Sequence, residues 1–257
     1  LGMPKIENIF GYVEFDQNNI EIKEAKATIL DSPIKLSLNN LGDITQVNID
    51  GIINEDFFRS AFGDDWANKL IGEASWFGEI KIKDKTTDIM VSSDLKGLQS
   101  DLPLPFNKDK DEVKTFLFTK QASKVNQEII KAEISTIVFA KLIKEIDANG
   151  KMEFKNGLIS INSPQKKLPE QGILLFAELS EVNFENFNSL FNNLGTKSLI
   201  TSADIDINEL DIFGYKILNS NIRYLPSSDK TNIQIKSDDV LGNILWNQNE
   251  NLVKAGF

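Results

Sequence analysis

Apolar and polar residues alternate with a period of two along most of this chain. In residues 34–38 isoleucine and leucine alternate with lysine and serine, and in residues 204–208 isoleucine alternates with aspartate and asparagine. This spacing puts the apolar side chains on one face of a strand and the polar ones on the other. The segments with this pattern, or with a short apolar run, are 34–38, 47–53, 80–83, 89–95, 113–119, 133–139, 143–154, 158–161, 172–179, 204–208 and 233–236.

Short turn sequences separate these segments. Asn149-Gly150 and Asn156-Gly157 are typical of tight turns between neighbouring strands. Strands that follow one another so closely favour antiparallel connections. The pattern therefore predicts a mainly β chain whose sheet has one apolar face and one face in water.

Two segments instead follow the period of a helix. Asn54 is expected to cap the first helix, and Gly63 is expected to split it into two short pieces. The second helix is expected to begin after Asn183 and to end at Gly195. The apolar stripes consist of Phe58, Phe62, Trp66 and Leu70 in the first helix and of Phe184, Phe187, Phe191 and Leu194 in the second.

The charge balance argues against binding to nucleic acid. The formal net charge is −10, and Arg59 and Arg223 are the only arginines among the 28 basic residues. An acidic surface that is poor in arginine repels phosphate backbones and anionic lipid surfaces. The longest apolar run, residues 173–177, is far shorter than the roughly 20 residues that span a bilayer as a helix.

The chain has no histidine and no cysteine, which excludes catalytic triads, thiol nucleophiles and thiolate zinc sites. The acidic pairs Asp64/Asp65 and Asp204/Asp206 suit a helix start and the polar face of a strand better than a pair of catalytic carboxylates. We predict no enzyme activity, no cofactor and no metal. The alternating acids of residues 107–112 lack the glycine and the final carboxylate of a calcium loop.

Residues 91–108 form the most distinctive segment of the sequence. Pro103 and Pro105 fix their backbone angles and lack an amide donor, so this segment is expected to run along an edge or leave the sheet. Together with the strand before it, the segment resembles the YhdP branch of the AsmA-like periplasmic proteins of Gram-negative bacteria. The residues that carry this family signature are Asp94, Leu95, Gly97, Leu102, Pro103 and Pro105.

Other parts of the chain are similar to the same family. Residues 11–51 resemble its first strand series, residues 66–76 its helix and following strand, and residues 204–246 its downstream strands. Residues 120–171 depart from the pattern, and Leu104 and Phe106 replace small polar residues of the proline segment.

The resemblance implies a long, curved antiparallel sheet with two short helices, whose concave apolar face is an open groove for phospholipid acyl chains. It also implies a periplasmic location in a protein anchored in the inner membrane, with neighbouring segments of the full-length chain as partners. The expected lining residues are Ile34, Leu36, Leu38, Val47, Ile49, Ile80, Ile82, Ile205, Ile207, Ile233 and Ile235.

Each of these residues is equally compatible with a closed core. The alternative functions are a non-catalytic carbohydrate-binding β-sandwich, suggested by Trp66, Trp76 and Trp246, and a scaffolding module. Because the chain begins with Leu1, we expect an internal fragment of a longer protein. We expect residues 1–257 to form one elongated domain, with a possible subdivision into 1–106 and 113–257 around the charged loop at 107–112.

Overall fold

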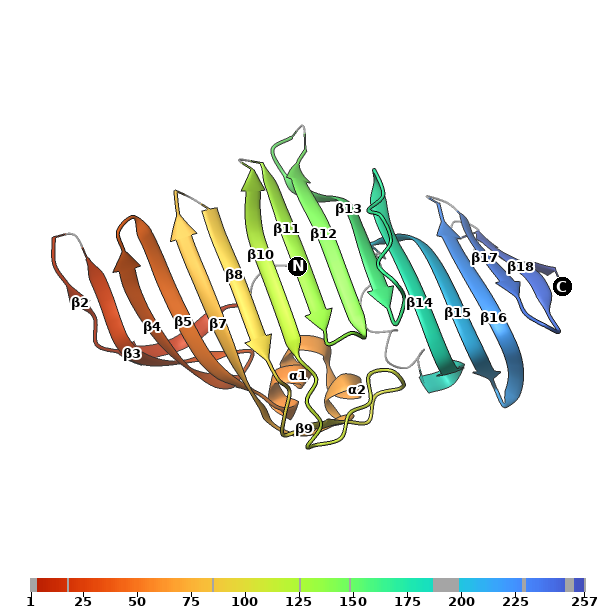
Figure 1. The fold of residues 1–257 in the computed structure, drawn as a ribbon, viewed down its shortest axis with the longest axis horizontal. Helices are drawn as coiled ribbons and strands as arrows, with labels where there is room; N and C mark the ends of the chain where they lie inside the picture. The colour runs from red at the N-terminus through yellow and green to blue at the C-terminus, as the bar shows by residue number, and fades with distance from the viewer. Residues whose placement is uncertain are drawn as a thin grey trace. The chain divides into compact units, whose positions relative to one another are not determined.

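The computed structural model of the chain consists mainly of β-strands and divides into two compact units (Figure 1). It describes residues 4–17, 19–84, 86–124, 126–147, 149–186, 199–227, 230–247 and 252–256. Unit 1 comprises residues 1–102 and 106–135, and unit 2 comprises residues 103–105 and 136–257. The prediction of a mainly β fold is confirmed. The predicted subdivision around residues 107–112 stays a prediction, and this loop lies inside unit 1.

Unit 1 is built around one antiparallel sheet. Its strands pair in the order β3, β4, β5, β7, β8, β10 and β11, and both β1 and β2 pair with the free side of β3. A separate small sheet pairs β6 with β9. The strands are β1 (Ile6–Gly11), β2 (Glu14–Phe15), β3 (Ile20–Ile29), β4 (Ser32–Leu41), β5 (Ile44–Ile53), β6 (Leu70–Gly72), β7 (Ala74–Lys83), β8 (Thr86–Ser93), β9 (Leu98–Ser100), β10 (Phe116–Lys124) and β11 (Gln127–Ile134).

Two short helices connect β5 to β6. Helix α1 (Glu55–Phe62) ends at Gly63, which adopts a positive φ of 90°, and α2 (Asp64–Ala67) begins directly afterwards. The predicted split at Gly63 is therefore confirmed. Leu70 belongs to β6, so its assignment to the helical stripe was wrong, because α2 ends after one turn. In Figure 1, α1, α2 and β9 lie at one end of the strands of unit 1.

Asn54 caps α1 as the sequence predicts. Its Oδ1 accepts hydrogen bonds from the Phe57 amide at 3.0 Å and from the Ser32 hydroxyl at 3.1 Å. The first bond satisfies one of the free amides at the helix start, and the second connects the helix to β4.

We expect Asn54→Ala to lower the free energy of unfolding by about 1–2 kcal/mol, because both donors lose their acceptor. Asn54→Asp keeps an acceptor at the helix N-terminus and is expected to retain the wild-type value. Urea denaturation of the two variants measures the difference. Equal stability of the alanine variant and the wild type would show that the cap contributes nothing.

The proline segment forms an irregular loop, in which residues 103–105 belong to unit 2 and the flanking residues to unit 1. Ser100 and Lys108 exchange two backbone hydrogen bonds of 2.8 and 2.9 Å, which close the loop around Pro103 and Pro105. The Lys108 side chain is buried, and its Nζ donates to the carbonyl oxygens of Leu98 and Asp109. Burial lowers the pKa of this ammonium below its usual range. The prediction that both prolines lie outside an inner strand is confirmed.

Unit 2 consists of strands β12 to β19, and their pairing is mixed. Two neighbouring pairings, β13 with β14 and β14 with β15, are parallel, whereas the other pairings within the unit are antiparallel. The expectation of antiparallel connections therefore fails at these two places. The strands are β12 (Val138–Ile146), β13 (Met152–Ile161), β14 (Gly172–Asn183), β15 (Ile200–Ile212), β16 (Tyr215–Pro226), β17 (Lys230–Lys236), β18 (Leu241–Asn247) and β19 (Leu252–Gly256).

Parallel neighbours require crossover connections, because each chain segment must return to the same end of the sheet. The connection from β13 to β14 is held by Asn156, whose Nδ2 donates to the Pro169 carbonyl at 2.9 Å. In the same connection, the Lys166 ammonium lies 3.7 Å from the ring centroid of Phe176. The crossover thereby covers a part of the sheet that would otherwise be exposed.

Three other sequence predictions differ from the structure in their boundaries. The strand predicted at 113–119 begins only at Phe116, and the runs 133–139 and 143–154 each contain a turn between two strands. Ser135, in the first of these turns, has a positive φ of 46°. Asn183 accepts a hydrogen bond from the Asn186 amide at 3.0 Å, as expected for the cap of the second helix. The rest of that predicted helix, from Phe187 to Leu194 and Gly195, lies outside the described residues.

Candidate functional site

One face of the unit 1 sheet, which we call the apolar face, is formed by cross-strand rows of apolar side chains. Residues that pair directly on neighbouring strands point to the same side of a sheet. Row 1 consists of Ala27, Ile34, Gly51 and Trp76. Row 2 consists of Ala25, Leu36, Ile49, Gly78, Val91, Phe118 and Ala132. Row 3 consists of Ile22, Leu38, Val47, Ile80, Ile89, Lys120 and Ile130.

On β3, β4, β5 and β7, burial decreases along the strands from row 1 to row 3, whereas the row 2 residues on β8, β10 and β11 are half-buried like those of row 3. Ile34 and Ile49, in rows 1 and 2, are each 4% exposed, whereas every member of row 3 is half-buried. Ile82, one row further along, is 42% exposed. The buried rows pack with Phe57 and Phe58 of α1 and with Leu70 and Leu98 of the small sheet. The apolar face therefore has a covered end beneath the helices and an open end.

The opposite face of the same strands is mainly polar on β4 and β5, with Phe77 of β7 as an apolar member. Lys35 pairs with Asp50, and Ser37 pairs with Asn48, which is in turn the partner of Glu79. The Gln46 amide donates to Asn48 at 2.9 Å and to Glu79 at 3.0 Å. A side-chain hydrogen-bond network of this kind is suited to contact with water.

In unit 2, a corresponding apolar face contains the remaining predicted residues. Ile205 is flanked in register by Ala177 and Ile222, and Ile235 follows Ile222. Ile207 and Ile233 point to the same side as these two. Ile207 is buried, whereas Ile205, Ile233 and Ile235 are half-buried. Within each unit, then, the structure brings the predicted lining residues onto a single face.

Sequence reasoning missed part of the unit 2 face. Val182 and Leu210 are buried in one cluster with Ile207, although Leu210 lies three residues after Ile207 and breaks the alternation. The change of phase coincides with Asn219 on the neighbouring strand, which has a positive φ of 51°. In the sequence, the break of the alternation is visible as Ile-Asn-Glu-Leu at 207–210, and it could have indicated that Leu210 lies on the same face as Ile207.

The family-signature residues lie in the loop segment between β8 and β10. Leu95 packs against the unit 1 core. Gly97 has a positive φ of 95°, and a Cβ at this position would collide with the Glu73 carbonyl oxygen. Asp94 Oδ1 accepts the Lys96 amide at 3.0 Å. The positive φ and the close carbonyl oxygen therefore require glycine at position 97. The remaining signature residues, Leu102, Pro103 and Pro105, follow after β9.

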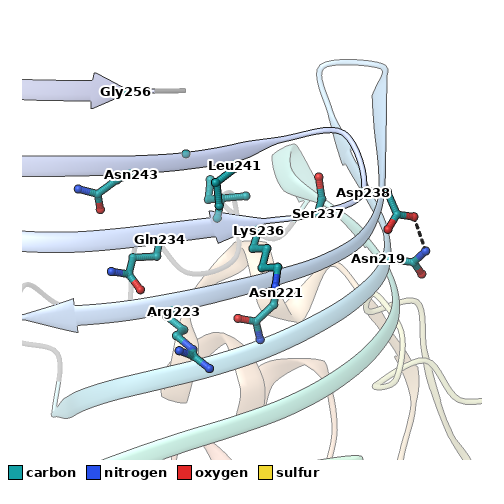
Figure 2. Close-up of a pocket in the computed structure, with 12 residues that line it drawn as sticks. Asn219, Asn221, Arg223, Gln234, Lys236, Ser237, Asp238, Leu241, Asn243 and Gly256 are labelled. Carbon is teal, nitrogen blue, oxygen red and sulfur yellow. Dashed lines mark hydrogen bonds between the residues drawn. The ribbon is translucent and has the colours of Figure 1, made fainter.

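A polar hollow of about 730 Å³ lies on the other face of the unit 2 sheet (Figure 2). The Asn221 amide donates to Asp204 at 2.7 Å and to Asp206 at 2.8 Å, and the Asn219 amide donates to Asp238 at 2.6 Å. These groups thus bind one another. Strands β16, β17 and β18 supply most of the lining, which includes Asn219, Asn221, Arg223, Gln234, Lys236 and Asn243.

The carboxylates considered for catalysis have structural partners. Asp64 pairs with Arg59 at 2.9 Å, while Asp204 and Asp206 accept the Asn221 amide. Among the described residues, no group of three or more acidic side chains lies close enough together to hold a metal ion. Trp66 packs against Phe62, and Trp76 is buried in unit 1, so neither lines the polar hollow. No helix within the described ranges is both long enough and apolar enough to cross a membrane.

A comparison with known protein families matches residues 2–255, nearly the whole chain, to the family described as YhdP protein. No curated protein and no solved structure matches the chain. The family match and the one-sided sheets agree with the resemblance carried by the proline segment. The chain belongs to the YhdP family, a family of bridge-like lipid-transport proteins of the cell envelope.

Proposed function

We propose that the apolar faces of both units carry the acyl chains of phospholipids, while the headgroups remain in water. The observation that supports this most strongly is the open end of the unit 1 face. There, large aliphatic side chains are only half-buried, and Ile82 in the next row is 42% exposed. Large exposed apolar surfaces on soluble folds are typical of binding sites.

Transfer of methylene groups from water to the apolar face favours binding of a long, flexible apolar chain and does not require specific polar contacts. Each methylene group that leaves water for an apolar surface contributes up to about 0.8 kcal/mol. Row 3 presents aliphatic side chains from β3 to β8 without a polar interruption, which suits an extended chain lying across the strands. Such binding needs no catalytic group, and sliding from one row position to the next breaks no hydrogen bond.

In this proposal the chain is a periplasmic segment of a protein that is anchored in the inner membrane by other parts. It passes phospholipid between the inner and outer membranes together with neighbouring segments of the full-length chain. The family match supports a role in the envelope and in lipid transport.

Site-specific photo-crosslinking tests this function, because adjacent residues of a strand face opposite sides. A photoreactive phenylalanine derivative at Ile80 or Ile235 is expected to crosslink to phospholipid when the protein is irradiated in Gram-negative cells. The same residue at Lys81 or Gln234 is the matched control, since these side chains point to the polar faces. We expect at least about tenfold more lipid adduct at the isoleucine positions, detected by mass spectrometry.

Equal adduct yields at Ile80 and Lys81 would contradict the proposal, because random contact with membranes does not distinguish the two faces. Adducts with a neighbouring protein segment in place of lipid at both isoleucines would indicate the scaffolding alternative.

A further inference from the structure

Lys120 interrupts row 3 of the apolar face. Its direct cross-strand neighbours are Ile89 on β8 and Ile130 on β11. The other members of the row are aliphatic, yet this position carries an ammonium group whose side chain is only 20% exposed. A lysine in such a row lays its methylene groups along the apolar surface and extends its charge toward water.

The ammonium group of Lys120 reaches a partner on the same face. Its Nζ lies 2.8 Å from Glu128 Oε1, and the Glu128 side chain is 24% exposed. Glu128 pairs with Ala122 on β10, so it lies one row beyond Lys120 toward the open end. Moving outward from the aliphatic rows, the face therefore presents first a positive and then a negative charge.

Stability alone does not explain this pair. Ion pairs that are largely removed from water usually contribute no more to folding than apolar side chains of the same size. Other residues of that outer row carry no charge, since Thr45 donates to Asn40 at 3.2 Å and Ile82 is an exposed aliphatic side chain. The two charges are thus the strongest electrostatic feature at the end of the face where acyl chains would emerge.

We propose that Lys120 and Glu128 bind a zwitterionic phosphoethanolamine headgroup, with the phosphate on Lys120 and the amine on Glu128. This inference rests on the proposed acyl-chain binding to the apolar face. In such a lipid the phosphate lies next to the glycerol and the amine lies further out, which is the order of the two side chains. An anionic phosphoglycerol headgroup satisfies Lys120 but leaves Glu128 without a cation, so it is the poorer ligand.

The test compares two phospholipids that have the same acyl chains and either a phosphoethanolamine or a phosphoglycerol headgroup. The purified chain is incubated with vesicles that contain both lipids in equal amounts, and the bound lipid is quantified by mass spectrometry. We expect about a fivefold preference for phosphoethanolamine, the size given by one or two partly exposed charge contacts. Lys120→Met, which keeps the apolar stem, is expected to abolish the preference.

Two further variants separate recognition from stability. Lys131→Met is the matched control, because Lys131 pairs with Thr119 on the polar face, and it is expected to keep the preference. The exchange Lys120→Glu with Glu128→Lys restores an ion pair, and hence stability, but reverses the order of the charges. We expect this double variant to unfold at the wild-type urea concentration and to lose the preference for phosphoethanolamine.

A double variant that keeps the full preference would overturn the inference and leave the pair with a structural role. Equal binding of both lipids by the wild-type chain would also overturn it, while the proposed acyl-chain binding would stand. A folded wild-type chain that captures neither lipid would overturn both.

Discussion

Ile34→Asp is expected to lower the free energy of unfolding of unit 1 by at least about 4 kcal/mol. Ile34 is 4% exposed and lies in row 1, between Ala27 and Gly51, beneath the helices. The substitution removes a buried aliphatic side chain and places a carboxylate in the apolar core cluster. Such a loss is a large part of the stability of a typical domain.

Hydrogen exchange measured by mass spectrometry localises the effect. Peptides from β3, β4 and β5 are expected to lose amide protection in Ile34→Asp. The matched control is Ile82→Asp, on the same face but 42% exposed, for which we expect a change within about 0.5 kcal/mol. If the two substitutions destabilised the chain equally, the apolar face would be covered along its whole length, and the lipid-binding proposal would lose its basis.

The contrast between Ile34 and Ile82 also marks the limit of what the sequence predicts. Strict alternation in residues 34–38 and 80–83 identified the face on which these isoleucines lie. Alternation carries no information on what packs against that face, because burial depends on α1 and the small sheet, which lie elsewhere in the sequence. The question of open groove or closed core therefore needed the structure, which assigns different burial to the two ends of one face.

Other parts of the fold could not be predicted from the sequence, for different reasons. The parallel pairings of β14 depend on the path of its crossovers. The apolar pattern of residues 172–179 does not indicate whether this strand pairs parallel or antiparallel with its neighbours. On β8, apolar residues occur at consecutive positions, Ile89, Met90 and Val91, so the period of two does not assign their faces. The helix cap at Asn54 and the break at Gly63 were predictable because a single side chain or backbone angle determines each of them.

Gly51→Ala is expected to cost about 2 kcal/mol, a large effect for one added methyl group. Gly51 is paired with Trp76, and a Cβ at residue 51 would collide with the indole ring. A Cβ at Gly78, on the other side of the ring, would lie 2.9 Å from Trp76 Cζ3. The indole therefore fills the space that two missing side chains leave on the apolar face, and Trp76 is only 8% exposed as a result.

A double-mutant cycle in urea denaturation tests this arrangement. Trp76→Leu alone is expected to cost about 3 kcal/mol, because the smaller side chain leaves a cavity above both glycines. In that background Gly51→Ala is expected to cost close to nothing, since the new methyl group enters the vacated space and alanine suits a strand better than glycine. Additive costs would show that the indole is not what excludes a side chain at residue 51. Because Trp76 Nε1 is buried without a hydrogen-bond partner among the described residues, we attribute the position of the ring to its packing against Gly51 and Gly78.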